Sequence, residues 1–147
     1  MGKIVYTGGT FDLIHNGHTR FLKACSRLAG KDGRVVVALN TDEFIEAYKG
    51  VSPIMSFDER KEILLGCRYV DAVVANFGGA DSKPAIESVM PDLIVIGDDW
   101  ARKDYYAQMQ FTQVWLDERD IQLVYVPYTK GISTTELKQR IAVSKIN

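Results

Sequence analysis

The sequence predicts an α/β fold in which a five-stranded parallel sheet is doubly wound, that is, covered by helices on both faces. Two observations predict this class. Five short apolar runs, rich in β-branched residues, are continuous rather than alternating, which is typical of strands buried on both faces of a parallel sheet. Segments with helical periodicity separate these runs, and regular alternation of strand and helix favours helices packed on a parallel sheet. We expect residues 1–147 to form one such domain.

The expected strands span residues 4–6, 35–39, 72–75, 93–96 and 123–126. The first helix is expected over residues 18–29, because apolar side chains recur there at helical spacing on one face. Gly30 ends this helix, since glycine readily adopts the left-handed conformation that follows a helix. A second helix is expected over residues 41–48.

Capping signals place the next helices. Ser56 and Glu59 have the spacing of a capping box, which predicts a helix from residue 56 through residue 65. Pro84 suits the first turn of another short helix, and Pro91 closes it.

The last helix begins at a second predicted capping box, Ser133 with Glu136, and runs through residue 141. With this helix, the order of elements is that of a Rossmann-like sheet. Ligands of such sheets bind beyond the carboxyl ends of the strands, where the strand order reverses. We therefore expect the functional residues in turns that follow strands.

Composition limits the kinds of partner that the protein can bind and the cellular compartment in which it is expected. The formal net charge is −1, so the chain has no overall basic field for holding nucleic acid or an anionic membrane. No stretch approaches the length of a membrane span, and the N-terminus lacks a signal-peptide pattern. Cys25 and Cys67 lack C-x-x-C spacing, which favours two buried thiols over a disulfide or metal site. We expect a cytoplasmic protein that binds neither nucleic acid nor membrane.

His15 and His18, the only two histidines, lie between the first strand and the first helix. A strand, a glycine-rich turn and a helix start form a phosphate site, because backbone N–H groups and the positive end of the helix dipole face the turn. Two imidazoles there can donate hydrogen bonds to a reacting phosphate and stabilise charge in its transition state. The alternative is that one histidine caps the helix and the other is solvated. The run G-T-F-D before H-x-G-H favours the phosphate role.

The neighbours of the histidines allow several roles. Gly8 and Gly9 let a phosphate approach the backbone closely, and Gly17 does the same beside the imidazoles, although tight turns without ligands also use glycine. Phe11 is expected in the core. Asp12 could orient a lysine, hold a metal ion or cap the helix, and the sequence leaves these three alternatives open.

Two further motifs follow later strands. Gly97-Asp98-Asp99-Trp100 follows the fourth strand, where a carboxylate and an aromatic suit a ribose or base contact, or alternatively a helix cap and a core tryptophan. Gly131-Ile132-Ser133-Thr134-Thr135 opens the last helix with hydroxyl and N–H donors, and phosphate binding is compatible there with an ordinary cap. Because each motif begins at the carboxyl end of a strand, all three can converge on one cleft.

These motifs carry a family resemblance. G-T-F-D-x-x-H-x-G-H resembles the signature of the nucleotidyltransferase superfamily that includes the cytidylyltransferases and pantetheine-phosphate adenylyltransferase. With G-D-D-W and G-I-S-T-T in the same order, nearly the whole chain resembles the glycerol-3-phosphate cytidylyltransferase family. The resemblance implies transfer of CMP from CTP to a small phosphorylated alcohol, first of all glycerol 3-phosphate, with release of pyrophosphate. It also implies a requirement for Mg²⁺ and a homodimer.

The resemblance further implies roles for individual residues. His15 and His18 would hold the α-phosphate region, Lys49 and Arg60 would be further catalytic residues, and Asp12 is the candidate metal ligand. The implied nucleotide-binding residues are Gly9, Thr10, Phe11, Gly17, Asp99, Trp100, Gly131, Ile132, Ser133, Thr134 and Thr135. The implied acceptor-binding residues are Arg68, Tyr128 and Lys130.

The last motif departs from the family pattern. The family usually reads R-T-E-G-I-S-T-T, whereas here Tyr128 and Lys130 stand at the arginine and glutamate positions. Lys130 could restore the positive charge from a shifted position, although a lysine lacks the planar fork of arginine. Residues 104–120 are also longer than usual for the family. We expect glycerol 3-phosphate as the first choice of acceptor, and a bulkier polyol or amino-alcohol phosphate as the second.

Three other classes of function are possible for a chain with these motifs. An ATP-dependent adenylyltransferase of the same superfamily differs only in base contacts, which the sequence does not display. A nucleotide-binding module without turnover has no need for both His15 and His18, so their pairing argues against it. A dinucleotide-binding oxidoreductase is disfavoured, because no G-x-G-x-x-G follows the first strand.

Overall fold

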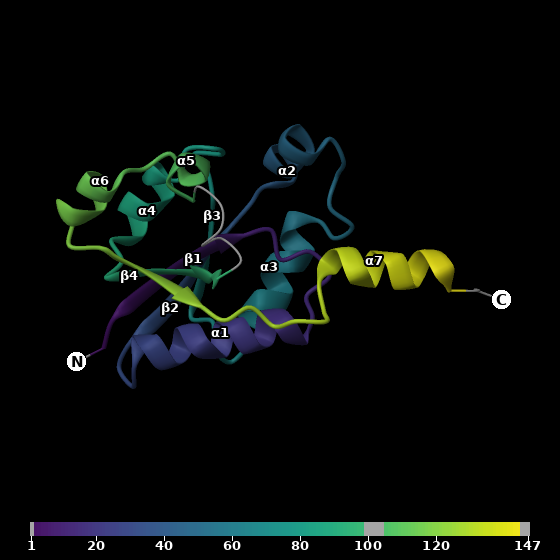
Figure 1. Ribbon diagram of the computed structural model, residues 1–147, viewed down its shortest axis with the longest axis horizontal. Helices are drawn as coiled ribbons and strands as arrows, with labels where there is room; N and C mark the ends of the chain where they lie inside the picture. The colour runs from purple at the N-terminus through teal and green to yellow at the C-terminus, as the bar shows by residue number, and fades with distance from the viewer. Residues whose placement is uncertain (1, 99–104, 145–147) are drawn as a thin grey trace.

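The computed structural model describes residues 2–98 and 105–144 and contains the predicted α/β sheet (Figure 1). Five strands pair in parallel in the order β3-β2-β1-β4-β5. Their bounds are Ile4–Gly9 (β1), Arg34–Leu39 (β2), Ala72–Ala75 (β3), Leu93–Gly97 (β4) and Gln122–Val126 (β5). Every predicted strand is confirmed. β1 continues beyond its predicted end, because Gly8 and Gly9 keep pairing with β2.

The helices are Asn16–Ala29 (α1), Asp42–Lys49 (α2), Phe57–Leu65 (α3), Lys83–Val89 (α4), Tyr105–Met109 (α5), Gln113–Asp117 (α6) and Thr134–Val143 (α7). The capping box of Ser56 and Glu59 forms as predicted, and Gly30 ends α1 with φ of 83°. The sequence pattern does not predict α5 and α6, because each is too short to show helical periodicity.

The predicted second capping box is only half correct. Ser133 accepts a hydrogen bond from the N–H of Glu136, as an N-cap should. The Glu136 carboxylate, however, pairs with Arg140 one turn further on, at 2.7 Å. The helix therefore starts where the sequence predicts, with one side-chain cap instead of two reciprocal ones.

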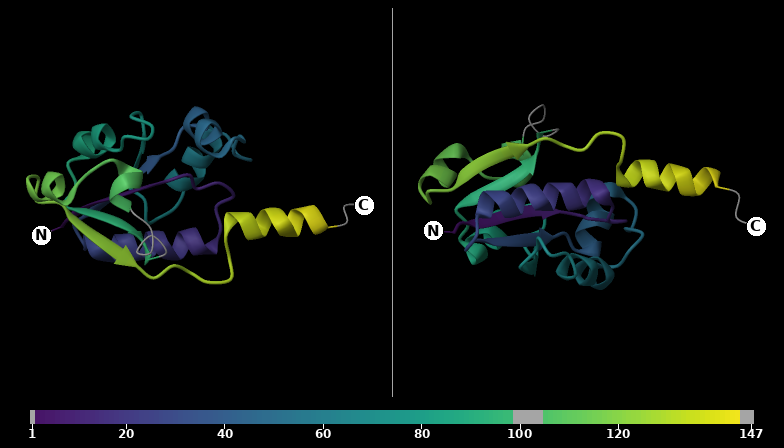
Figure 2. Two further views of the ribbon diagram at one scale, coloured as in Figure 1. Left: turned by 45° about the horizontal axis from the view of Figure 1, so that its top comes forward. Right: turned by 90° about the horizontal axis from the view of Figure 1, so that it is seen from below.

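Helices cover both faces of the sheet, as Figure 2 shows from two further directions. Alternate strand residues point to opposite faces. On one face Cys25 of α1 packs with Val5 and Val95. On the other face Ile86 of α4 packs with Ile94. The doubly wound class is thus confirmed. Cys25 and Cys67 are free thiols; Cys25 is buried as predicted, whereas Cys67 is only partly buried.

The strand order determines where a ligand can bind. The chain runs from β1 outward to β2 and β3, and then returns to place β4 on the other side of β1. The order therefore reverses between β1 and β4, which is the switch point that opens a crevice in such sheets. α7 projects from the body of the molecule near this end, with none of its residues buried (Figure 1). Within the described residues, no helix has the length and apolar character needed to cross a membrane.

Candidate active site

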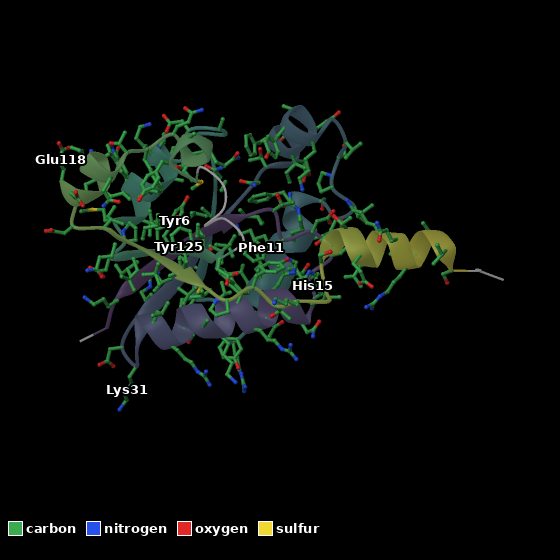
Figure 3. All side chains as sticks on the ribbon, viewed as in Figure 1. Tyr6, Phe11, His15, Lys31, Glu118 and Tyr125 are labelled. Atoms are coloured by element: carbon green, nitrogen blue, oxygen red, sulfur yellow. The ribbon has the colours of Figure 1, made fainter. Side chains whose placement is uncertain are left out.

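The turn after β1 is built around the two histidines. His15 is the N-cap of α1, and its Nδ1 accepts a hydrogen bond from the N–H of Gly17 at 3.0 Å. The Nδ1 of His18 accepts in turn from the N–H of His15 at 3.1 Å. The pair thus forms a capping box from imidazoles, where serine or threonine with glutamate is usual. Figure 3 shows His15 at the start of α1, next to the start of α7.

These two hydrogen bonds fix the tautomers of the imidazoles. A nitrogen that accepts a hydrogen bond carries no proton, so the proton of each neutral ring is on Nε2. Each histidine therefore offers an Nε2–H donor. The His15 Nε2 is buried and has no hydrogen-bond partner among the described residues. A buried donor without a partner is costly, so this Nε2–H calls for an acceptor from a water or a ligand.

Burial keeps both rings neutral. The ring centroids of His15 and His18 lie 3.9 Å apart, and the Phe11 ring lies 5.2 Å from that of His18. Burial, together with the nearby His15, lowers the pKa of His18 to about 4, while Asp12 opposes this shift. Burial also lowers the pKa of His15. Near neutral pH both rings are therefore neutral hydrogen-bond donors.

Side chains of the turn itself explain two of its glycines. A Cβ on Gly17 would lie 2.8 Å from the His15 ring, and a Cβ on Gly9 would lie 2.9 Å from the Phe11 ring. Both distances are shorter than real side-chain contacts, so a larger residue at either position would force the His15 or the Phe11 ring to shift. Phe11 is buried as expected, in the left-handed conformation with φ of 52°. Strain of this kind in a non-glycine residue is concentrated at functional sites.

Asp12 connects three segments of the chain. Its carboxylate accepts hydrogen bonds from the N–H groups of Ile54 and Met55, at 2.7 and 2.9 Å. Its backbone carbonyl accepts from the Thr134 hydroxyl at 2.6 Å, and Lys138 Nζ lies 3.9 Å from its carboxylate. Among the three roles left open by the sequence, the geometry therefore displays the oriented lysine. The helix cap is His15 instead, and a metal role for Asp12 stays a prediction.

Arg60 is fully buried, with an exposed fraction of 0%. Its guanidinium donates to the carbonyl oxygens of Thr10, Asn40 and Met55 and forms an ion pair with Asp42 at 2.6 Å. Arg60 does not line the cavity described below. This geometry favours a positioning role, in which Arg60 holds the turns after β1 and β2, over the direct phosphate contact implied by the family resemblance.

A cavity of about 450 Å³ lies at the carboxyl ends of the strands. The predicted site residues that line it are Gly9, Thr10, Phe11, Asp12, Gly17, His18, Lys49, Tyr128 and Thr134. The turns after β1, β2 and β5 and the start of α7 thus meet at one cavity. The sequence predicts this convergence for the turn after β1 and for the last motif, but not for the turn after β2. The cavity reaches from Asn76 after β3 to Gly97 at the end of β4.

Other predicted site residues lie outside the cavity lining. His15 is one of them, although its ring packs against that of His18, which does line the cavity. Arg68 precedes β3, at the amino end of the sheet, where its guanidinium contacts the Tyr69 ring. Because the cavity is at the opposite end, Arg68 cannot reach a ligand there without a rearrangement. Lys130 is exposed and does not line the cavity either. Asp99 and Trp100 lie outside the described residues, while the neighbouring Asp98 accepts a hydrogen bond from the N–H of Tyr128 at 3.0 Å.

The last motif is placed around the start of α7. Gly131 has φ of 82°, Ile132 contacts the Gly17 turn, and Ser133 caps the helix. Thr135 is exposed, so of this motif only Thr134 borders the cavity.

Several residues of the cavity lining were not predicted from the sequence, and three of them carry polar side chains at informative positions. Lys138 lies four residues after Thr134, so both side chains share one face of α7 and both line the cavity. Asn40 and Asn76 directly follow β2 and β3 and line it too. Their positions in the sequence could have predicted them. Asn40 and Asn76 are polar residues directly after a buried strand, and Lys138 lies one helical turn after a motif residue.

The fold and the site together define a class of protein. The parallel sheet carries paired imidazole donors at its switch point. Lysines from two helices and the start of α7 lie at the same end of the sheet. Together these features can bind the phosphates of a nucleotide. This is the architecture of a nucleotidyltransferase.

Known proteins agree with this class. A family model described as cytidylyltransferase-like matches residues 6–140. A glycerol-3-phosphate cytidylyltransferase from Bacillus subtilis (strain 168) is 38% identical over 140 residues, which cover 95% of this chain and 98% of the relative. An FAD synthase from Korarchaeum cryptofilum (strain OPF8) is 32% identical over 148 residues, covering 96% and 92%. The chain belongs to the cytidylyltransferase-like family and is a nucleotidyltransferase.

A solved structure supports the fold alone. The lipopolysaccharide core biosynthesis protein from Thermoplasma volcanium GSS1 superposes with a TM-score of 0.68 at 23% identity, covering 88% of this chain and 100% of that one.

Proposed function

We propose that the protein transfers CMP from CTP to a small phosphorylated alcohol, with glycerol 3-phosphate as the first choice of acceptor. The observation that carries this proposal is the pair of neutral imidazoles, each with its Nε2–H free of the capping bonds. The similarity to a glycerol-3-phosphate cytidylyltransferase over nearly the whole chain supports the choice of nucleotide and acceptor.

The reaction needs positioning and charge stabilisation rather than a covalent intermediate on the protein. A phosphate oxygen of the acceptor attacks the α-phosphorus of CTP in line, the bond to the bridging oxygen breaks, and pyrophosphate leaves. The Nε2–H groups of His15 and His18 donate to the α-phosphate oxygens, whose negative charge grows in the transition state. Because both rings are already neutral and locked by the cap, they require no reorganisation at the moment of transfer.

The leaving pyrophosphate requires positive charge. Lys49 from α2 and Lys138 from α7 line the cavity, and Thr134 places a hydroxyl and the N-terminus of α7 beside them. Mg²⁺ would supply further neutralisation of the charge on the leaving group. Asp12 would hold it through Oδ2, which accepts one N–H bond, from Ile54, whereas Oδ1 already accepts two, from Leu13 and Met55.

Measurement of pyrophosphate release tests the proposal. CTP, ATP, GTP and UTP are each combined with glycerol 3-phosphate, larger polyol phosphates and amino-alcohol phosphates, in the presence of Mg²⁺. We expect the highest kcat/KM with CTP and glycerol 3-phosphate. Negligible turnover of glycerol 3-phosphate alongside turnover of another phosphorylated alcohol would replace the acceptor, and no turnover of any pair would refute the proposed reaction.

Adenylyl transfer from ATP is the second candidate. The similarity to an FAD synthase favours it, because FAD contains an adenine nucleotide. Tighter binding of ATP than of CTP in a calorimetric titration, with matching turnover, would make this the function. We further propose that the protein acts in the cytoplasm as a homodimer. Cell fractionation tests the first of these, and light scattering in solution tests the second.

A further inference from the structure

Three polar side chains form a line of hydrogen bonds across the carboxyl ends of β1, β2 and β3. Thr10, Asn40 and Asn76 each directly follow one of these strands, and all three line the cavity. Asn76 Nδ2 donates to Asn40 Oδ1 at 3.0 Å, and Asn40 Nδ2 donates to Thr10 Oγ1 at 3.2 Å. The line therefore runs from the end of β3 to the turn that carries the two histidines.

The backbone brings these side chains into register. The N–H of Asn40 donates to the Gly9 carbonyl at 2.9 Å, and the N–H of Asn76 donates to the Leu39 carbonyl at 2.9 Å. Both bonds extend the parallel pairing by one residue, beyond the ends of β1 and β2 and of β2 and β3. Equivalent positions on neighbouring parallel strands lie side by side, so the three side chains meet.

One acceptor that cannot change its role sets the direction of the whole line. The Gly79 carbonyl can only accept, and Asn76 Nδ2 donates to it at 2.9 Å. Because the same Nδ2 also faces Asn40, the Asn40 amide turns its oxygen toward Asn76 and its own Nδ2 toward Thr10. A reversed Asn76 amide would set two oxygens against each other at Gly79. The present direction is kept although Asn76 Oδ1 is buried without a hydrogen-bond partner among the described residues.

This direction determines what the Thr10 hydroxyl offers to the cavity. A hydroxyl has one proton, and an amide Nδ2 can only donate, so the Thr10 oxygen accepts from Asn40 and its proton points elsewhere. Thr10 lines the cavity, so this proton is available to a ligand there. With the opposite amide direction, Asn40 would take the proton, and Thr10 would present only lone pairs to the ligand.

A phosphate oxygen is the acceptor that suits this donor. The non-bridging oxygens of an ionised phosphate only accept hydrogen bonds, and a bond from a hydroxyl to such an anion is stronger than one to a neutral group. Thr10 shares its turn with His15 and His18, whose Nε2–H groups suit the same kind of acceptor. Arg60 holds the backbone carbonyls of Thr10 and Asn40, so it fixes where the turn lies but not where the hydroxyl proton points.

We infer that Asn40 and Asn76 are positioning residues for the transfer reaction: their amides hold the Thr10 hydroxyl as a donor to a phosphate oxygen at the reacting centre. Neither amide has to touch the substrate, because both act through Thr10. The inference rests on the proposed function, since it requires a reacting phosphate at this turn.

A double-mutant cycle tests whether Asn76 acts through Thr10. Pyrophosphate release is measured with saturating CTP, Mg²⁺ and the acceptor that gives the highest turnover. Thr10→Val removes the hydroxyl and keeps the shape of the side chain, and it should lower kcat by about ten- to a hundredfold, as expected for a hydrogen bond to a charged group. Asn76→Leu frees the Asn40 amide to turn its oxygen toward Thr10, and it should lower kcat by about tenfold, the usual net effect of one hydrogen bond.

The combined variants give a readout that a merely structural role would not produce. In the Thr10→Val protein, Asn76→Leu should change kcat by less than about twofold, because the hydroxyl through which it acts is already absent. In the Thr10→Ser protein, which keeps a hydroxyl, Asn76→Leu should again lower kcat by about tenfold. Gln122→Ala removes an exposed amide at the amino end of β5 and should leave kcat unchanged in every background. Asn76→Ser is a milder change, measured in parallel so that the cycle stands if leucine disturbs folding.

The outcomes separate this inference from the proposed function. An equal loss from Asn76→Leu with and without the Thr10 hydroxyl would mean that Asn76 only shapes the cavity, and would overturn the inference while the reaction stands. Unchanged kcat in a folded Thr10→Val protein would overturn it too, without any change at Asn76. The absence of pyrophosphate release by the unmodified protein with every nucleotide and acceptor would overturn both.

Discussion

At the scale of single residues, the two histidines combine a structural and a chemical role. Their Nδ1 atoms cap α1, and this same bonding leaves their Nε2–H groups for a ligand. The alternatives of helix cap and phosphate contact are therefore compatible within one imidazole. The two roles can be separated by substitution, because only the cap can be imitated by a shorter polar side chain.

His15→Asn is the variant that separates them. Asparagine is a strong N-cap, so the free energy of unfolding should stay close to that of the unmodified protein. His15→Ala removes the cap as well and should lower stability by about 1 kcal/mol. Both variants, and His18→Ala, should lower turnover by about 10²–10³, the usual cost of losing a transition-state donor. Near-normal turnover in a folded His15→Asn protein would contradict the proposed role; chemical denaturation and steady-state kinetics provide the two measurements.

The pKa of His18 predicts a pH dependence of stability. Its folded-state pKa of about 4 lies below the ordinary value of 6.5. Between these values the unfolded chain binds the proton and the folded chain does not, so stability falls as pH decreases from 6.5 toward 4 and is insensitive to His18 above 6.5. His18→Gln should remove this part of the slope. Thermal unfolding of both proteins without ligand, at half-unit steps of pH, measures the difference; identical slopes would contradict burial as the cause.

Lys138 should contribute more to nucleotide binding than Lys130. Its side chain lines the cavity on the same face of α7 as Thr134, whereas Lys130 does not line it. A charge-assisted hydrogen bond contributes about 1.5–3 kcal/mol, so Lys138→Ala should raise the KM for CTP by about ten- to a hundredfold. Lys138→Arg should restore much of the affinity. Lys31→Ala is the control, because it removes one positive charge at the end of α1 opposite His15 (Figure 3) and should leave the KM for CTP unchanged. A larger effect from Lys130→Ala than from Lys138→Ala would contradict this ranking.

At the scale of elements, one buried side chain joins the turns that form the site. Arg60 projects from α3 to the carbonyls that end β1 and β2 and to Asp42 at the start of α2. The loop from residue 50 to residue 55 is held in turn by the Asp12 carboxylate. The geometry of the site thus depends on contacts between elements more than on any one element.

Arg60→Ala should therefore destabilise the fold as well as the site. The carbonyls of Thr10 and Asn40 would lose their donor, and each buried acceptor left unpaired costs about 1–3 kcal/mol. Arg60→Lys should rescue little, because an ammonium cannot span these acceptors as the planar guanidinium does. Arg119→Ala removes an ion pair with Glu87 and a cation–π contact with Trp115 at the surface, and should cost only about 1–2 kcal/mol. Urea denaturation would show the contrast; a fully stable Arg60→Ala protein with lost turnover would instead indicate direct phosphate contact.

At the scale of the whole molecule, ligand binding should be visible as stability. A ligand that binds only the folded state at a hundred times its Kd stabilises it by about 2.7 kcal/mol. We expect CTP with Mg²⁺ to raise the Tm by several degrees, and EDTA to remove most of that shift, because the metal binds mainly through the phosphates. Scanning fluorimetry with CTP, Mg²⁺ and EDTA separately and together measures this. A comparable shift from Mg²⁺ alone would contradict the prediction and point to a metal site held by the protein.

The strands, the helix starts and the phosphate-binding turn can be predicted from local sequence patterns. Each strand of the sheet follows from a continuous apolar run, and the starts of α3 and α7 follow from Ser56 and Ser133. The paired histidines after β1 indicate the phosphate site, because their spacing and the turn that carries them lie within a few residues. All these features are determined by contacts between near neighbours along the chain, which a sequence displays directly.

The partners of the individual side chains follow from the tertiary structure and not from local patterns. Arg60 meets Thr10 across 50 positions of sequence, and Asp12 meets Ile54 across 42. Such pairs form because parallel strands bring their carboxyl ends together, and no periodicity records which side chains then meet. For this reason the sequence pointed to Arg60 as a catalytic residue, whereas the fold buries it. For the same reason Lys138 and Asn76 were recognised only once the strands and α7 enclosed a common cavity.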